Sequence, residues 1–416
     1  MLDVELIRKE PERVKDGLRK KGADAKLVDK FLKLDEEWRA KTLAAETLKK
    51  EQNAITKDVA ARRAEDLVAK ANVLKKRIAG LSDEQAELLG KRDAVLNSMP
   101  NLPFDDVPAG RDESENKTLR EVGAIPEFGF EPKDYLSLGE SLGLIDVKRA
   151  AEVAGSRFGY LLGGAALIEL ALVRLAFEVA VKKGFVPVIP PVMLRPDVYE
   201  GIGRLAADQK DERYFLEKDN LYLAGSSEHT LAPLHMGETL KEKELPLRYV
   251  AFSTCFRREA GSYGKDTKGI LRVHQFDKVE LFSFAHPEKS EEEHTFLLSV
   301  QEELMKKLEL PYRVVEVCAG DMGFTDARQY DIEAWFPSEG KYRETHSCSN
   351  TTDFQSRGTK TSFKAKDGAK RPVHTLNATA FSQRPILAVL ENFQTKDGTV
   401  KLPKILHEYT GLKELS

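Results

Sequence analysis

The chain has 416 residues, of which 41% are hydrophobic and 32% are charged, and its formal net charge is −3. This composition supports two or three domains of roughly 150 residues, whereas no apolar run is long enough for a transmembrane helix and the start of the chain lacks the pattern of a signal peptide. The three cysteines, Cys255, Cys318 and Cys348, exclude a disulfide scaffold and lack the paired spacing of a metal site, so we expect reduced thiols, no zinc and a cytoplasmic protein.

The first hundred residues have the pattern of a helical hairpin. Proline is absent from Glu12 to Met99, and because proline breaks helix interiors, the gap permits long helices. Apolar residues recur there at alternating spacings of four and three, in two frames separated by the polar stretch 62–66, which predicts an antiparallel pair of coiled-coil helices. The frames comprise Leu27, Phe31, Leu34, Trp38, Ala45, Leu48, Ile55 and Val59, then Leu67, Ala71, Leu74, Ile78, Leu81, Leu88 and Val95, with Lys41, Gln52, Gln85 and Arg92 as polar interruptions.

Basic residues concentrate in the distal half of this hairpin. The stretch from Arg39 to Arg77 holds eleven basic and five acidic residues. A projecting arm with surplus positive charge indicates a polyanionic partner, and an ordinary solvated coiled-coil surface is the alternative. The candidate contact residues are Arg39, Lys49, Lys50, Lys57, Arg62, Arg63, Lys75 and Lys76.

The pattern changes after Pro100. A turn-rich linker over 101–110 precedes an apolar helix expected at Gly164–Lys183, with Gly184 at its C-terminal cap. Extended runs are predicted at 185–192, Leu247–Ser253, Arg272–Phe284, Tyr312–Cys318, Tyr330–Phe336 and Thr375–Ala380, and helices at Glu288–Leu308 and Arg384–Phe393. Because strands and helices rarely alternate, we expect an α+β fold, with a helical arm over 1–110 and a domain on an antiparallel sheet flanked by helices over 111–416.

Two segments of the second half carry the candidate chemistry. The run 256–280 reads as strand, glycine-rich loop and returning strand, and a period of two would place Arg272, His274, Phe276, Lys278 and Glu280 on one face. Such a face suits a ligand with phosphates, a planar base and an amine, and a surface strand with ion pairs is the alternative. In the second segment, Glu344 and Ser347 offer the oxygen ligands that Mg²⁺ prefers. The chain has no P-loop or Rossmann glycine pattern opening a helix.

These segments together resemble the bacterial-type seryl-tRNA synthetases, a family of class II aminoacyl-tRNA synthetases. The run 256–280 is similar to class II motif 2, Gly184–Pro191 to motif 1, which forms the dimer interface in that class, and Asn377–Asn392 to motif 3. The resemblance covers nearly the whole chain. It implies a class II catalytic domain, a homodimer, no membrane attachment, a hairpin that binds the long variable arm of serine tRNA, and a loop at Gly261–Gly269 that faces the acceptor stem.

The resemblance also implies the reaction and the site residues. Serine would be activated with ATP to seryl-adenylate and transferred to the 3′ end of serine tRNA, with selenocysteine tRNA left open as a second acceptor. The catalytic residues would be Arg257, Glu259, Arg272 and Arg384. The residues that bind ATP would be Arg257, Arg258, Glu259, Val273, Phe276, Arg343, Glu344, Thr345, His346, Ser347 and Arg384. L-Serine would be bound by Ser226, Ser227, Glu228, Arg257, Glu280 and Thr379, and Mg²⁺ by Glu344 and Ser347.

Three short segments depart from the common pattern of that family. The chain has Ser226-Ser-Glu where Thr-x-Glu is usual, Glu344-Thr-His-Ser where Glu-Ile-Ser-Ser is usual, and Asn377-Ala-Thr-Ala where Asn-Gly-Ser-Gly is usual. Two alternatives follow from such departures. One is a synthetase-like protein that binds without catalysis, and the other is a ligase that loads an amino acid onto a carrier protein.

Overall fold

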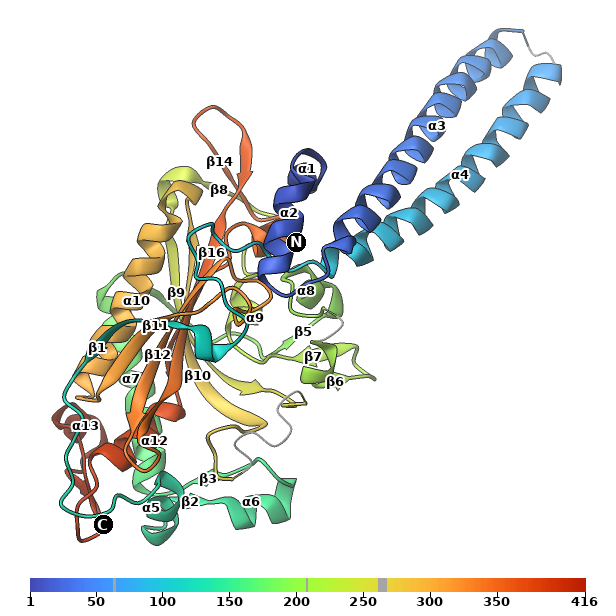
Figure 1. The fold of residues 1–416 in the computed structure, drawn as a ribbon. Coiled ribbons are helices and arrows are strands. Elements are labelled where there is room, and N and C mark those ends of the chain that lie inside the picture. Colours follow the sequence, from blue (N-terminus) through green and yellow to red (C-terminus); the bar gives the residue numbers. More distant parts are fainter. Residues whose placement is uncertain (63–64, 207–208, 261–267) are drawn as a thin grey trace. The chain divides into compact units, whose positions relative to one another are not determined.

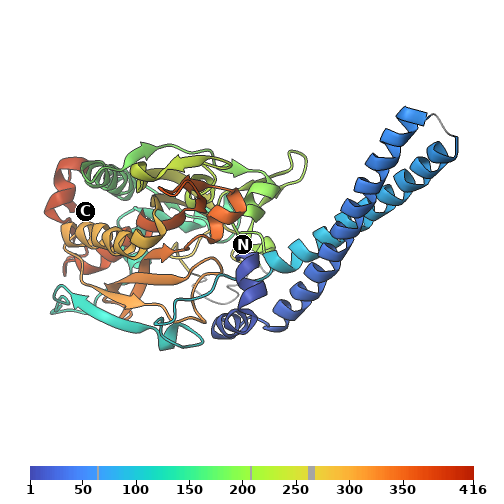
Figure 2. The same ribbon diagram turned by 90° about the horizontal axis from the view of Figure 1, so that it is seen from above.

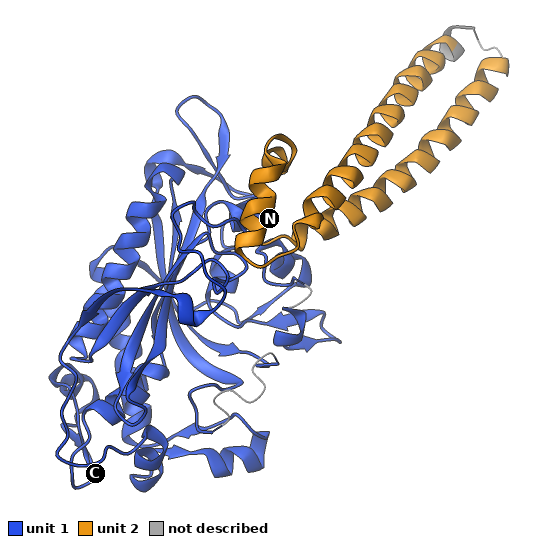
Figure 3. Ribbon diagram, in the orientation of Figure 1, with its two compact units in different colours: residues 1, 101–416 blue, residues 2–100 orange. Residues whose placement is uncertain are grey.

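The computed structural model describes residues 1–62, 65–206, 209–260 and 268–416. The chain forms two compact units, one of residues 2–100 and one of residue 1 together with residues 101–416 (Figure 3). In the part of the chain that is described, no helix is both long and apolar enough to cross a membrane.

The smaller unit is helical throughout. Two short helices, α1 (Val4–Lys9) and α2 (Pro11–Lys20), precede the long helices α3 (Lys26–Arg62) and α4 (Glu65–Asn97). The long helices run side by side in both views of the ribbon (Figures 1 and 2), which confirms the predicted hairpin. The predicted turn includes residues 63 and 64, which lie outside the described residues.

The predicted seam is confirmed along the hairpin. Its described apolar members are buried or half-buried, and Phe31 and Ala45 are among the fully buried side chains. Three of the polar interruptions are satisfied between the helices, and one of them, Lys41, forms an ion pair with Glu84. Gln85 Nε2 donates a hydrogen bond to Thr42 Oγ1 at 2.6 Å, and the Arg92 guanidinium lies 4.6 Å from the centroid of the Trp38 ring.

A buried carboxylate ties α1 to the hairpin. The Asp35 side chain is inaccessible to solvent and accepts hydrogen bonds from Nε and Nη2 of Arg8, both at 2.8 Å. Arg39 Nε lies 3.1 Å from the same carboxylate and Arg92 Nη1 lies 3.5 Å away. Because a buried charge is tolerated only when it is paired, the three arginines explain why an aspartate can occupy this core position.

The larger unit is built on an eight-stranded sheet with strand order β1-β11-β12-β13-β16-β10-β9-β4. In that order the strands are Lys117–Val122, Tyr312–Glu316, Arg328–Phe336, Lys341–Asn350, His374–Ser382, Gln275–Ala285, Leu247–Phe256 and Val186–Val188. Every pair is antiparallel except β4 with β9. The predicted α+β class and its antiparallel sheet are therefore confirmed.

Three helices share one core with this sheet: α7 (Gly164–Lys182), α10 (Ser290–Lys307) and α12 (Arg384–Asn392). Alternation along β10 divides its side chains between two cores, with Leu281 in the core of these helices and Phe282 in a second, smaller one. Gly184 has a φ of +87° just after α7, and the amides of Gly184 and Phe185 donate to the carbonyls of Val181 and Ala180. This is the glycine C-cap that the sequence predicts.

The remaining elements are short. The helices are α5 (Tyr135–Ser141), α6 (Val147–Ala154), α8 (Pro196–Gly201), α9 (Glu228–Leu231), α11 (Phe354–Thr359) and α13 (Lys404–Thr410). The strands are β2 (Ile145–Asp146), β3 (Tyr160–Leu161), β5 (Met193–Leu194), β6 (Phe215–Leu216), β7 (Leu221–Leu223), β8 (Thr239–Lys241), β14 (Ser362–Lys364), β15 (Lys370–Pro372), β17 (Val400–Lys401) and β18 (Glu414–Leu415).

Two predicted strands require correction. The extended run expected at 185–192 contributes only Val186–Val188 to the sheet, because the three prolines within it cannot donate ladder hydrogen bonds. The strand expected to begin at Arg272 begins at Gln275. His274 therefore does not share the face of Phe276. Its Nδ1 lies 3.0 Å from the Arg257 carbonyl oxygen, and its ring packs near Phe158.

Candidate active site

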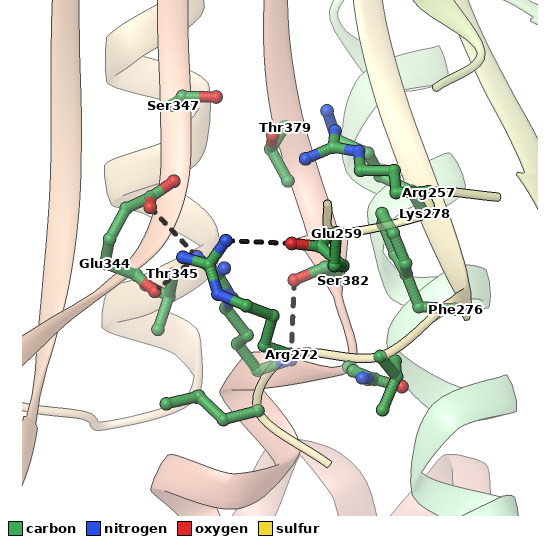
Figure 4. Close-up of a pocket in the computed structure, with 14 residues that line it drawn as sticks. Arg257, Glu259, Arg272, Phe276, Lys278, Glu344, Thr345, Ser347, Thr379 and Ser382 are labelled. Atoms are coloured by element: carbon green, nitrogen blue, oxygen red, sulfur yellow. Dashed lines mark hydrogen bonds and ion pairs between the residues drawn. The ribbon is translucent and has the colours of Figure 1, made fainter. Parts of the chain in front are cut away.

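Side chains from four segments line one cavity of about 240 Å³. The segments are the end of β9, the approach to β10 together with its start, β13, and the end of β16 leading into α12. This first cavity is lined by Arg257, Glu259, Leu271, Arg272, Val273, Phe276, Lys278, Glu344, Thr345, Ser347, Thr379, Ser382, Gln383 and Arg384. In Figure 4, Ser347 and Glu344 lie on one side of this space, across from Thr379 and Arg257. Residues predicted from two distant stretches of sequence thus share one cavity.

A second cavity of about 510 Å³ shares six of these residues with the first and extends past them. It is lined by Arg204, Glu212, Arg213, Glu228, His229, Arg257, Glu259, Arg272, Lys278, Asp321, Gly323, Asp326, Gln329, Ser347, Ser349, Asn377 and Arg384. Most of these residues are charged or polar, so the cavity suits a charged or hydrogen-bonding ligand rather than an apolar one.

Arg257 is a cation that none of the described carboxylates pairs with. It follows β9 directly, and its Nε donates to the Gly225 carbonyl oxygen at 3.1 Å. The guanidinium carbon lies 5.2 Å from the centroid of the Phe276 ring. Among the described residues no carboxylate forms an ion pair with Arg257. Its charge is therefore available to an anion that enters the first cavity.

The other cations at the first cavity are held by carboxylates. Arg384, the first residue of α12, lies 3.0 Å from the Glu344 carboxylate, and Arg272 lies 2.8 Å from that of Glu259. The positive charge of Arg384 lowers the pKa of Glu344, and this outweighs the opposing effect of desolvation. The Glu344 side chain is 48% exposed, so an ionised carboxylate faces the cavity.

A buried ion pair supports the floor of the second cavity. Arg204 Nη2 and Gln355 Nε2 both donate to Glu228 Oε1 at 2.7 Å, and Glu228 is 4% exposed. No described residue donates to the other carboxylate oxygen, Oε2. The charge of Arg204 lowers the pKa of Glu228 against the effect of burial. The glutamate thus remains an anion with one oxygen left for a positively charged ligand.

Glu280 is a second buried carboxylate at this end. It is inaccessible to solvent and pairs with Lys278, whose side chain lines both cavities. Ser226 Oγ donates to Glu280 Oε2 at 3.2 Å, whereas Oε1 is buried and has no hydrogen-bond partner within the described part of the chain. An unsatisfied buried acceptor costs about 1–3 kcal/mol. The unsatisfied Oε1 of Glu280 is therefore suited to accept a hydrogen bond from a bound ligand.

Strands β13 and β16 separate where the first cavity opens. They pair only from Cys348 to Asn350. Just beyond, Gln301 of α10 inserts between them, and its Nε2 donates to the carbonyl oxygens of Ser347 and Thr379, both at 2.8 Å. Because one amide nitrogen bridges both carbonyls, the side chain of Gln301 sets the spacing between the two strands at the cavity.

Six of the predicted site residues line neither cavity: Ser226, Ser227, Arg258, Glu280, Arg343 and His346. Arg343 forms an ion pair with Glu339 at 3.1 Å. Ser227 Oγ lies 2.7 Å from Ser253 Oγ within the core.

His346 is buried between strands and lines neither cavity. It is buried, with Nε2 at 3.0 Å from the Ala380 carbonyl oxygen, and burial lowers its pKa to about 4. The imidazole is therefore neutral at physiological pH. Its contact continues the link between β13 and β16 beyond the point where their ladder ends.

The donor set for a divalent cation is small but suitable. Within the described residues no group of three or more His, Cys, Asp or Glu side chains could hold a metal ion. Glu344 and Ser347 nevertheless line the same cavity with their oxygen-bearing side chains. Mg²⁺ in nucleotide sites is commonly held by one or two carboxylates plus substrate phosphates, so these residues fit Mg²⁺ that arrives with a nucleotide.

On the hairpin, the predicted basic residues face solvent. Lys49, Lys50, Lys57, Lys75 and Lys76 are exposed. Arg39 is exposed as well but pairs with Asp35, so its charge is partly used within the unit. Arg63 lies outside the described residues, as does the side chain of Arg62.

Sequence reasoning missed Arg204 and Gln355, the two partners of Glu228. They come from segments far from it in sequence, and neither segment carries a pattern that points to the other. Lys278 belongs to the predicted face of the strand, but its ion pair with the buried Glu280 was not predicted.

Known proteins are similar to this chain over nearly its full length. Two family models match, the seryl-tRNA synthetase N-terminal domain over residues 1–103 and the tRNA synthetase class II core domain (G, H, P, S and T) over residues 214–393. The serine–tRNA ligase of Thermobifida fusca is 45% identical, covering 99% of this chain and 98% of that protein. The serine–tRNA ligase of Acidothermus cellulolyticus is 47% identical, covering 99% of this chain and 98% of that protein.

Solved structures agree over the full length. A seryl-tRNA synthetase from Pyrococcus horikoshii complexed with ATP matches with a TM-score of 0.92 and 44% identity, covering 100% of this chain and 99% of that chain. A cytoplasmic serine–tRNA ligase from Naegleria fowleri in complex with AMP matches with a TM-score of 0.87 and 32% identity, covering 100% of this chain and 99% of that chain.

Proposed function

The chain belongs to the seryl-tRNA synthetase family, and on that premise we propose that it is a serine–tRNA ligase that activates L-serine with ATP and transfers the seryl group to serine tRNA. The observation that carries this proposal is the unpaired guanidinium of Arg257, which shares one cavity with Arg384, Glu344 and Phe276. We propose residues 111–416 as the catalytic domain and residues 1–110 as the tRNA-binding arm.

ATP would occupy the first cavity. Its adenine would stack on Phe276, its α-phosphate would meet Arg257, and Arg272 and Arg384 would face the outer phosphates. Glu259 and Val273 line the same cavity and would help to fix the base. Glu344 and Ser347 would hold Mg²⁺, which when bound offsets the negative charge of the phosphates.

L-Serine would bind beside the α-phosphate. Glu228 has an oxygen without a donor and would accept the ammonium group, with Ser226 next to it. Glu280 Oε1 would accept the hydrogen bond of the serine hydroxyl. Thr379 lines the first cavity on the neighbouring strand and would lie near the same side chain.

The chemistry requires no protein nucleophile. A serine carboxylate oxygen attacks the α-phosphorus and forms the new P–O bond, while the bond to the bridging oxygen of pyrophosphate breaks and pyrophosphate takes the electron pair. Since both reactants are anions, positioning and cationic stabilisation supply most of the rate enhancement. A terminal ribose hydroxyl of the tRNA then attacks the seryl carbonyl, and AMP leaves.

The rival functions receive less support. An inactive binding protein would have no need of the paired and unpaired cations that the first cavity retains. A ligase acting on a carrier protein would have no use for the N-terminal domain, which matches that of seryl-tRNA synthetases over residues 1–103. Charging of a serine tRNA transcript with labelled serine tests the proposal, and an inactive homologue would give no product.

Dimer formation is part of the proposal. Several apolar side chains on α7 and beside β4 are exposed, with Leu170 at 64% and Ile189 at 76%. Apolar surface of this kind is typical of an interface, and Ile189 lies in Gly184–Pro191, the segment that resembles class II motif 1. We also propose that the protein works in the cytoplasm, because its three cysteines are free.

Replacing Glu280 with glutamine is expected to weaken discrimination against alanine. The charged acceptor becomes a neutral one, so the ratio of kcat/KM for serine over alanine should fall by about 10- to 100-fold. Serine- and alanine-dependent pyrophosphate exchange measure this ratio. Glu293→Gln, which alters another buried glutamate paired with an arginine, should leave the ratio unchanged. A constant ratio in Glu280→Gln would assign the hydroxyl to another partner.

Replacing Gln301 with glutamate is expected to raise the KM for serine by about tenfold. The side chain keeps its shape, but a carboxyl group donates one hydrogen bond when protonated and none when ionised, so it cannot bridge the carbonyl oxygens of Ser347 and Thr379. The serine site and the Mg²⁺ ligands would shift relative to each other, whereas Phe276 and Arg257 would stay in place. Pyrophosphate exchange titrated with serine, Mg²⁺ and ATP separates these effects. Lowered thermal stability with unchanged KM values would reduce Gln301 to a packing residue.

A further inference from the structure

Two arginines of the second cavity have no anionic partner among the described residues. Its other cations are each paired with a glutamate: Arg204 with Glu228, Arg272 with Glu259, Arg384 with Glu344, and Lys278 with Glu280. Arg257 is the first unpaired guanidinium, and the proposed function gives it the α-phosphate. Arg213 is the second, and the function described so far gives it no ligand.

Arg213 makes few contacts with the described residues. Its Nε is buried without a hydrogen-bond partner in the described part of the chain, and its one aromatic neighbour is the Tyr199 ring, 5.8 Å away. Burial lowers the pKa of the guanidinium, and the positive charges of Arg257 and Arg204 lower it further, against the opposing effects of Tyr199 and Glu212. A partly buried cation beside two other arginines is stabilised when an anion joins it.

The neighbouring imidazole does not change this balance. His229 lines the same cavity, and its Nδ1 accepts a hydrogen bond from the Gly225 amide at 3.0 Å. Burial lowers the pKa of His229 well below its usual value, and the charge of Arg213 adds to this. The imidazole is neutral at physiological pH, so an anion at this place would be attracted chiefly by guanidinium groups.

The location of Arg213 separates its ligand from the nucleotide. Arg213 lines the second cavity but not the first, where Phe276 and Gln383 lie. Its segment is joined to the residues that follow β9, since the Arg258 amide donates to the Glu212 carbonyl oxygen at 3.0 Å. Arg258 also places its guanidinium 5.9 Å from the centroid of the Tyr214 ring. An anion at Arg213 would thus lie near Arg258, in the segment that follows β9 and resembles motif 2.

Two anions in the proposed reaction could reach this end of the cavity. One is the serine carboxylate, which loses its charge when the adenylate forms and which the family resemblance already assigns to Arg257. The other is the phosphodiester on the 5′ side of the terminal nucleotide of the tRNA, which must come close when its ribose hydroxyl attacks the seryl carbonyl. We propose that Arg213 binds this terminal phosphodiester and positions the tRNA 3′ end for seryl transfer.

This inference rests on the proposed function and predicts different effects on its two half-reactions. In Arg213→Gln, serine-dependent pyrophosphate exchange should stay within about twofold of the unaltered protein, because the phosphodiester takes no part in activation. Transfer from enzyme-bound seryl-adenylate to tRNA, measured in a single turnover at subsaturating tRNA, should slow by at least about tenfold. The slope of log affinity for tRNA against log salt should fall by about 0.7, the value for one single-stranded phosphate contact.

Two further variants complete the test. Lys210→Gln removes the same charge from an exposed position three residues away that lines neither cavity, and it should leave both half-reactions unchanged. Arg213→Lys keeps a point charge without the planar fork, and its transfer rate should lie between those of Arg213→Gln and the unaltered protein. It also serves as the test variant if Arg213→Gln does not fold.

The outcomes are distinguishable. A raised KM for serine in exchange, with normal transfer from preformed adenylate, would assign Arg213 to the carboxylate and overturn the inference. Normal rates in both steps, or an equal loss in Lys210→Gln, would overturn it as well. Absence of exchange in the unaltered protein would instead contradict the proposed function itself.

Discussion

Arg257→Ala is expected to reduce serine-dependent pyrophosphate exchange by at least about 100-fold, because it removes a cation of the first cavity that pairs with none of the described carboxylates. Loss of a single preorganised group that stabilises developing negative charge typically lowers kcat by 10²–10³. The fold should survive, since the substitution breaks no ion pair and the Nε contact to the Gly225 carbonyl is a single hydrogen bond.

A surface arginine provides the matched control for this experiment. Arg371 is exposed, lines neither cavity and pairs with Asp367, so Arg371→Ala should exchange pyrophosphate at the normal rate. Thermal unfolding of both variants would show whether the fold is retained. Undiminished exchange in Arg257→Ala would refute the assignment of the α-phosphate to this residue.

Removing the distal part of the arm is expected to abolish tRNA charging while sparing adenylate formation. Gln85 contacts Thr42 across the hairpin, so residues 49 and 77 lie at about the same level along the two antiparallel helices. Replacing 49–77 with a short glycine-rich linker therefore shortens both helices equally. The deleted stretch contains nine basic and four acidic residues. Its loss removes the attraction to the tRNA backbone, so charging should fall by at least about 100-fold at physiological salt.

A second variant separates charge from length. Replacing Lys49, Lys50, Lys75 and Lys76 with glutamine leaves the helices intact, because these side chains are exposed and glutamine is a good helix former. Its charging should weaken with a reduced dependence on salt, while pyrophosphate exchange stays normal in both variants. Normal charging without 49–77 would remove the arm from the mechanism.

Much of the fold could be predicted because regular patterns encode it. The heptad spacing of the hairpin gave the seam along both long helices, and even its polar interruptions Gln85 and Arg92 pair across it. Strand β13 was not predicted, since its sequence is polar almost throughout. Some of its side chains face the cavity, as Ser347 does, and others find partners in the core, as His346 does with the Ala380 carbonyl. Hydrophobic alternation cannot reveal such a strand.

The site was predictable only in part, for a related reason. The family resemblance named Arg257, Glu344 and Arg384, and the structure places them at one cavity. The supporting contacts depend on tertiary placement. Gln301 meets β13 and β16 from a helix, and Arg204 meets Glu228 from a loop. The sequence positions of these residues do not indicate either contact, because each contact depends on how distant segments pack.

The central claim is that this chain activates serine on ATP held between Arg257 and Arg384. Pyrophosphate exchange by the unaltered protein, screened with serine, threonine, alanine, cysteine and glycine, tests it most directly. We predict exchange that depends on serine and is at least about 100-fold weaker with alanine, since Glu280 would lose its hydroxyl partner. No exchange with any of the five, or faster exchange with another amino acid than with serine, would contradict the claim.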